Sequence, residues 1–342
     1  MKQLLTASRQ AAQLTCPRKH FWSYEIGLRR IETGLALRFG SAWHRGMEAR
    51  WRGATYETAL AAAIPDGVDL DELAAETVAA LLCGYYHHYG ARDTLFSSIS
   101  PEIEFHQDLP GSRSFRDAGK IDGIGVLADG RSAIKEHKTT SDDIGPDSDY
   151  WMRLRFHPQL LQYVSAARQM GIQIETAIYD VARKPGIQPK QIPMLDDQGR
   201  KVVLDSTGNR VMKKDGQPRE SGDAEKGYVV QSRVETPKEF GDKLFQDTLA
   251  RPDFYFARRE VPILDQDLDE FRAQRLVVSR MILASRAQEK HQARRSQAWP
   301  RNIGMACDWC EYAVFCLQNL SVDASNPPTG FLIGNTNPEL KK

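Results

Sequence analysis

An acidic residue and a lysine stand two positions apart at the end of a hydrophobic approach, in the segment "AIKEHKTTSDD". If this segment is a strand, Glu136 and Lys138 point to the same face, about 6.6 Å apart along it. Asp122 lies in the preceding run "AGKIDGIG", and the turn "LADGRS" would make the two strands antiparallel neighbours. The pattern predicts that all three side chains converge. A second Glu-x-Lys, Glu339 and Lys341, lies in a polar segment near the carboxyl end, so the triplet alone decides nothing.

Two convergent carboxylates suit a hard divalent cation such as Mg²⁺, which prefers oxygen ligands. A lysine beside such a cation can orient or help deprotonate an attacking water, and its charge can stabilise a pentavalent phosphate. The chemistry predicted for Asp122, Glu136 and Lys138 is therefore phosphodiester hydrolysis.

In this order and spacing the residues resemble the PD-(D/E)xK nuclease superfamily, specifically its RecB-like branch. Members carry a histidine on a helix ahead of the sheet, matched by His44 in "FGSAWHRGMEA". They also carry a Gln-x-x-x-Tyr helix after the lysine strand, matched by Gln159 and Tyr163 in "HPQLLQYVSAAR". The resemblance covers residues 10–320, apart from 184–226.

The resemblance implies that His44, Asp122 and Glu136 ligate Mg²⁺ or Mn²⁺. It also implies that the carbonyl of His137 adds a backbone ligand and that Lys138 serves the nucleophile.

The same resemblance implies that Gln159 and Tyr163 face the site and position the substrate phosphate. Taken singly, each residue has an ordinary alternative. His44 could be satisfied by Glu48 one helical turn later, Asp122 could cap a turn, and Tyr163 could be a core residue. The prediction of a nuclease site rests on the whole set of residues occurring in the same order as in the family.

The chain contains five cysteines. Cys307, Cys310 and Cys316 form C-x2-C-x5-C, Cys16 lies far upstream, and Cys83 falls inside an expected helix as a small buried hydrophobe. In a reducing cytoplasm a disulfide framework is unfavourable, so the cluster predicts a thiolate-bound metal. Four cysteines can also close a tetrahedral zinc site, although zinc ribbons usually pair two knuckles.

One early cysteine followed by C-x2-C-x5-C resembles the iron-sulfur variants of RecB-like nucleases, including the AddB nuclease domain and the CRISPR-associated adaptation nucleases. The resemblance implies a [4Fe-4S] cluster that joins the two ends of the chain. Its ligands would be Cys16, Cys307, Cys310 and Cys316.

Hydrophobic periodicity predicts an α/β (α+β) fold in which a helix packs on a mixed sheet. The resemblance implies a restriction-endonuclease-like core, with a mixed central sheet flanked by helices. The expected strands form a meander of about three, followed by a helix over 150–171 and a further strand at 174–183. An amphipathic helix with a basic outer surface is expected after Pro262, with Leu264, Leu268, Phe271, Val278 and Ile282 on its apolar face.

We expect one nuclease domain over 1–320 and no internal repeat. Its parts are a catalytic core at about 40–183, an exposed hairpin arm or insertion at 184–226, a cysteine segment at 303–320 and a flexible tail at 321–342.

The net charge is +1, so any nucleic-acid surface must be local. Basic residues are in excess at 1–60 and 271–301. No run is apolar enough to span a bilayer and no secretory signal is recognised, which predicts a cytoplasmic protein, in the host cytoplasm if phage-encoded.

The predicted function is a metal-dependent DNA exonuclease of recombination, repair or replication, acting on single-stranded or end-containing DNA. No phosphate-loop motif is present, so a motor would come from a helicase or recombination partner. The alternatives are an endonuclease of the same fold, including a zinc-stabilised one, and a catalytically silent DNA-binding subunit.

Overall fold

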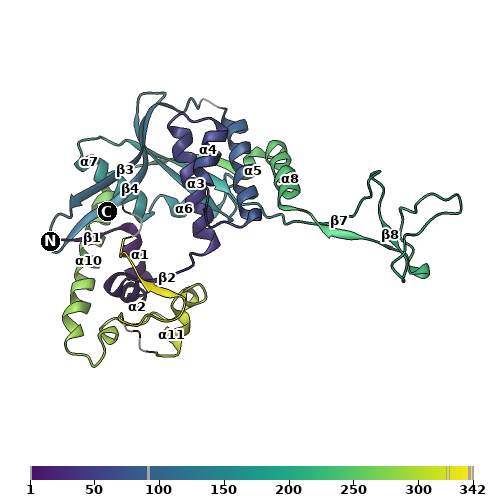
Figure 1. The fold of residues 1–342 in the computed structure, drawn as a ribbon. Helices are drawn as coiled ribbons and strands as arrows, with labels where there is room; N and C mark the ends of the chain where they lie inside the picture. The colour runs from purple at the N-terminus through teal and green to yellow at the C-terminus, as the bar shows by residue number, and fades with distance from the viewer. Residues whose placement is uncertain (1, 91–92, 321, 323, 338–339, 341–342) are drawn as a thin grey trace.

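The computed structural model describes residues 2–90, 93–320, 322, 324–337 and 340. A mixed six-stranded sheet forms its centre, with helices on both faces (Figure 1), which confirms the predicted restriction-endonuclease-like α/β architecture. The order is β1-β4-β5-β6-β11, and β3 pairs with β4. These strands are β1 (Gln3–Leu5), β3 (Phe96–Asp108), β4 (Phe115–Leu127), β5 (Ser132–Thr140), β6 (Thr176–Arg183) and β11 (Phe256–Pro262).

Two hydrophobic layers enclose the sheet. One face packs against α7 and α10, and the other packs against α3, α4, α5 and α8. The α-helices of the described chain are α1 (Ala7–Thr15), α2 (Pro17–His20), α3 (Leu35–Trp51), α4 (Tyr56–Ala63), α5 (Glu72–Tyr89), α6 (Asp149–Leu154), α7 (Pro158–Gln169), α8 (Pro237–Ala250), α9 (Pro252–Tyr255), α10 (Asp265–Glu289) and α11 (Ala313–Leu317). None of them is both long and apolar enough to cross a membrane.

The predicted meander of β3, β4 and β5 is present, and β4 has two different partner strands along one of its edges. Strand β3 runs antiparallel along one edge of β4. On the other edge, β1 pairs with Phe115–Asp117 and β5 pairs only with 123–126. On the amino-terminal side of Gly123 the two strands separate, while β5 remains paired in parallel with β6; the point of separation is called the fork below. Asp122 therefore stands at the fork.

The single helix expected over 150–171 is wrong, because the chain forms two helices there. Helix α6 ends at Leu154, and α7 begins at Pro158. Proline lacks an amide hydrogen and disfavours helical backbone at the residue before it, so a helix can begin at Pro158 but cannot run through His157.

Helix α10 has the predicted apolar face, with two corrections. Leu268, Phe271, Val278 and Ile282 are buried, but Leu264 precedes the helix and is 45% exposed. Arg275, expected on the basic outer surface, is fully buried, and its Nε donates to Asp117 Oδ1 at 3.0 Å. A buried charge of this kind must be paired, so Arg275 ties α10 to the sheet and cannot contact DNA.

The two ends of the chain form one lobe beside the sheet. Strand β2 (Leu28–Arg30) pairs antiparallel with β12 (Phe331–Ile333). The Tyr312 hydroxyl donates to the Leu28 carbonyl at 2.8 Å, and Trp299 is fully buried in the same cluster. The segment expected to be a flexible tail thus contributes β12 to this lobe.

The segment after β6 extends away from the body as a long arm (Figure 1). Its stalk pairs β7 (Gln191–Pro193) with β10 (Ser232–Val234), so the excursion runs beyond the expected boundary at 226. Beyond the stalk, β8 (Val203–Leu204) pairs with β9 (Val229–Val230).

The arm contains a short internal repeat that the sequence analysis missed. Three glycines with positive φ, Gly199, Gly208 and Gly216, each close a turn. Backbone amides of Val202, Val211 and Arg219 then bond to the carbonyl of the residue eight positions earlier. Each unit is too short for periodicity to show, and only its glycine turn signals it.

Candidate active site

At the fork between β4 and β5, Asp122 lies beside the strand that carries Glu136 and Lys138. Because β5 no longer pairs with β4 there, the His137 amide donates to Asp122 Oδ2 at 2.8 Å. Glu136 precedes it and is 1% exposed. The structure thus places Asp122 beside the Glu136-x-Lys138 triplet, as the sequence predicted.

A chain of hydrogen bonds links the triplet to α7. Lys138 Nζ lies 2.5 Å from Glu136 Oε1 and 2.7 Å from Gln159 Oε1. Gln159 Nε2 donates to the Tyr163 hydroxyl at 2.8 Å. The second oxygen of Glu136 is buried without a hydrogen-bond partner in the described part of the chain. A buried carboxylate oxygen with no donor suits a bound cation.

The structure separates the roles of Gln159 and Tyr163. Gln159 lines a cavity of about 700 Å³ in front of the carboxylates, together with His44, Asp122 and Lys138. Tyr163 is 5% exposed and belongs to the hydrophobic core behind Gln159.

His44 lies on α3 and faces Asp122, with 3.4 Å between its Nδ1 and Asp122 Oδ2. Loss of water around the ring lowers the pKa of His44 to about 4. The imidazole is therefore neutral at physiological pH, the form in which histidine binds metals.

Burial makes both carboxylates hard to ionise without a cation. It raises the pKa of Asp122 to about 6. Burial, and then the charge of Asp122, raise the pKa of Glu136 to about 7. A positive charge near these carboxylates would relieve this cost.

Glu102 is a site residue that the sequence analysis missed. Ligand atoms of His44, Glu102 and Asp122 all lie within 4.8 Å of one another. Glu102 stands in β3 between Pro101 and Ile103, whose partners in β4 flank Asp122, and its φ of 59° is left-handed. A non-glycine residue held in this strained conformation is typical of functional sites. Glu102 also forms an ion pair with Lys120.

No sequence pattern separates Glu102 from Glu104, because both stand in "PEIEF". Only the register opposite Asp122 could have distinguished them. The His137 side chain lies on the opposite face of β5 from Glu136 and Lys138, where Lys135 pairs with Asp180 at 3.0 Å. Its ring centroid is 6.0 Å from that of His44. The role of the His137 carbonyl stays a prediction. The second triplet, Glu339 and Lys341, lies outside the described residues.

The sequence matches the family described as the PD-(D/E)XK nuclease superfamily over residues 4–317, nearly the whole chain. The chain belongs to the PD-(D/E)XK nuclease superfamily. It is thus a nuclease, a hydrolase for which the family implies DNA as substrate. PD-(D/E)XK nucleases typically use divalent metals, and the group of His44, Glu102 and Asp122 is a possible site.

A solved structure titled "Crystal structure of SSO0001" is similar to this PD-(D/E)XK nuclease at 13% identity and a TM-score of 0.32, over 94% of this chain and 89% of that one. No curated protein matches the chain.

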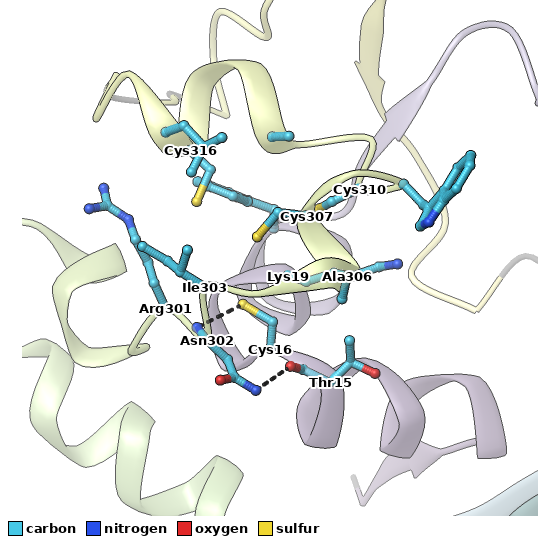
Figure 2. A pocket seen from close by; sticks show the side chains of 14 residues that line it. Thr15, Cys16, Lys19, Arg301, Asn302, Ile303, Ala306, Cys307, Cys310 and Cys316 are labelled. Carbon is cyan, nitrogen blue, oxygen red and sulfur yellow. Dashed lines mark hydrogen bonds between the residues drawn. The ribbon is translucent and has the colours of Figure 1, made fainter.

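A second cavity of the PD-(D/E)XK nuclease gathers four of its five cysteines, although they are widely spaced in the sequence (Figure 2). Cys16, Cys307, Cys310 and Cys316 line a space of about 260 Å³. Cys83 is elsewhere, half-buried on α5, and lines a small pocket with Tyr56.

The cysteine cavity is wider than a single zinc ion requires. Zinc bound at about 2.3 Å would hold tetrahedral sulfurs about 3.8 Å apart. Among the described residues, no three of these thiols lie within 4.8 Å of one another. Burial also raises the pKa of Cys310 and Cys316, so a bound metal would have to displace their protons.

Proposed function

We propose that this nuclease is a metal-dependent DNA exonuclease of the RecB-like branch, acting on single-stranded or end-containing DNA in recombination, repair or replication. The convergence of Asp122, Glu136 and Lys138 at the fork of β4 and β5 supports the hydrolytic part of the proposal most strongly. These three residues retain every group that the chemistry needs, which disfavours a silent DNA-binding subunit.

We assign the metal ligands to His44, Glu102, Asp122, Glu136 and the carbonyl of His137. When bound, Mg²⁺ or Mn²⁺ supplies Lewis-acid polarisation of a phosphoryl oxygen.

Lys138 is held by Glu136 and Gln159, so its ammonium group is fixed beside the carboxylates. From there it can orient a water molecule. The water gives up a proton as its oxygen forms a bond to phosphorus, the bond from phosphorus to the leaving sugar oxygen breaks, and the leaving oxygen takes up a proton, so one proton is released and one is consumed. Gln159 positions Lys138 and substrate, while Tyr163 acts through Gln159 from the core.

The cavity walls suit a phosphate chain. Arg45, Lys120 and Lys184 line the cavity with Lys138, so cationic groups surround the acidic centre. Such groups bind the backbone without reading bases, which predicts little sequence preference.

The test of the function compares linear and closed DNA. We expect end-labelled linear single strands to be degraded with Mg²⁺ or Mn²⁺ and untouched in EDTA, and closed single-stranded circles of the same sequence to be largely spared. Circles cut as fast as linear strands would replace the exonuclease with an endonuclease. No cleavage under any condition, with DNA binding retained, would favour the silent subunit.

For the cysteine cavity we propose a [4Fe-4S] cluster held by Cys16, Cys307, Cys310 and Cys316. The donor set and a space larger than one ion support it. We further propose a cytoplasmic setting, in the host if the gene is phage-encoded, and a helicase or recombination protein as partner, because the chain has no phosphate-loop motor of its own.

Glu102 gives the metal assignment a sharp test. We expect Glu102→Gln to weaken Mn²⁺ binding by about tenfold or more, because one anionic ligand is lost while the side-chain shape is kept. Isothermal titration measures the affinity. Glu104→Gln is the matched control, since Glu104 lies two residues away and pairs with His106 at 2.8 Å. Equal affinities in both variants would remove Glu102 from the ligand set.

A further inference from the structure

The basic residues of 271–301 fall into two groups. Four form ion pairs: Arg272 with Asp269, Arg275 with Asp117, Arg286 with Glu25 and Arg295 with Glu289. The other four, Arg280, Lys290, Arg294 and Arg301, have no acidic partner among the described residues. These four cations are available for a ligand.

Two of the unpaired arginines meet a third in one hollow of the terminal lobe. Arg18, Arg294 and Arg301 line a cavity of about 470 Å³, together with Ser296, Gln297 and Asn319 among other residues. No described lining residue is a carboxylate. Three guanidinium groups that share a hollow without a counter-ion repel one another. A bound anion would offset this repulsion.

Two of these arginines, Arg18 and Arg301, are held in place by hydrogen bonds. Arg18 is 8% exposed, and its Nε donates to the Trp299 carbonyl at 2.8 Å. Burial, and then the charge of Arg301, lower the pKa of Arg18 from its usual value. Arg301 Nη2 donates a hydrogen bond to Asn319 Oδ1 at 2.6 Å, while its Nε is buried and has no hydrogen-bond partner among the described residues.

The cysteines provide a competing explanation for part of this charge. Arg301 also lines the cysteine cavity, and both Arg301 and Arg18 interact with the Cys316 thiol, so these two arginines could balance thiolates there. Arg294 does not line that cavity. Thiolate balance therefore does not account for all three arginines.

We propose that this hollow is a phosphate-binding site, in which Arg18, Arg294 and Arg301 hold a backbone phosphate of the DNA substrate. Arginine suits the site because its fork of donors matches phosphate oxygens. The inference rests on the proposed nuclease function and extends it, since it makes the terminal lobe a second DNA contact outside the catalytic cavity.

The experiment measures single-stranded DNA binding by fluorescence anisotropy in EDTA across a range of salt, so cleavage does not interfere. We expect Arg294→Ala to weaken binding and to lower the slope of log affinity against log salt by about 0.7, the value for one phosphate contact on single strands. Arg294→Ala with Arg301→Ala should lower it by about twice that amount. Arg280→Ala is the matched control, because Arg280 is exposed and unpaired on α10 but lies outside the hollow.

Iron content and melting temperature are measured on the same variants. Unchanged affinity and slope in Arg294→Ala and in the double variant would overturn the site, and a loss of iron in the double variant would then assign Arg301 to thiolate balance alone. An equal loss in Arg280→Ala would also overturn it, since diffuse attraction would then suffice. Failure of the proposed function looks different, because wild-type protein would bind DNA and cleave none with Mg²⁺ or Mn²⁺.

Discussion

Asp122→Asn and Glu136→Gln are each expected to reduce DNA cleavage by about a thousandfold or more while leaving DNA binding largely intact. Each change removes one anionic ligand, and a catalytic metal is worth several kcal/mol of transition-state stabilisation. The asparagine can still accept the His137 amide, so the fork should keep its shape. Cleavage of end-labelled DNA and binding in EDTA measure the two effects separately.

The same variants should be more stable than wild type when no metal is bound. Folding raises the pKa of Asp122 to about 6 and that of Glu136 to about 7. An acid whose pKa is raised by folding destabilises the protein as pH increases from its unfolded pKa, near 4, through its folded pKa. The melting temperature of each variant should therefore exceed that of wild type at pH 8, and the difference should close near pH 4. Full cleavage in both variants would contradict the active-site assignment.

If the proposed cluster is present, Cys16→Ser is expected to abolish the binding of iron and sulfide and to lower the melting temperature by several degrees. Cys16 comes from the start of the chain and the other three thiols from its end, so its loss opens the cavity between them. Iron and sulfide analysis after anaerobic purification, with thermal melting, measures both effects.

Cys83→Ser is the matched control, because Cys83 lies on α5 outside the cavity, and it should keep its iron. Iron lost from the Cys83 variant but not from the Cys16 variant would show that the ligand set is wrong. Stoichiometric zinc in wild-type protein would replace the cluster with a zinc site.

Features set by side-chain periodicity and by the order of residues along the chain could be predicted from the sequence. Strand alternation placed Glu136 and Lys138 together, and the short turn after β4 made Asp122 their neighbour. The buried face of α10 followed from helical spacing, apart from Leu264.

Features that depend on contacts between distant segments could not be predicted in this way. Glu102 becomes a site residue only through its register opposite Asp122 and a left-handed backbone, and neither leaves a periodic signal. Arg275 looks like a surface cation until Asp117 is placed beside it. Pro158 gave a local signal for the break between α6 and α7, but the apolar periodicity on both sides of it concealed the break.

The pairing of β2 with β12 has a consequence for the order in which the nuclease matures. A ribosome releases Leu28–Arg30 roughly three hundred residues before Phe331–Ile333, and chains synthesised at about 5–20 residues per second keep this strand without its partner for many seconds. The sheet can form in that interval, since β3 to β11 emerge first. The cysteine cavity needs residues from Cys16 and from Cys307 to Cys316, so it can close only after the strands of the sheet have been synthesised.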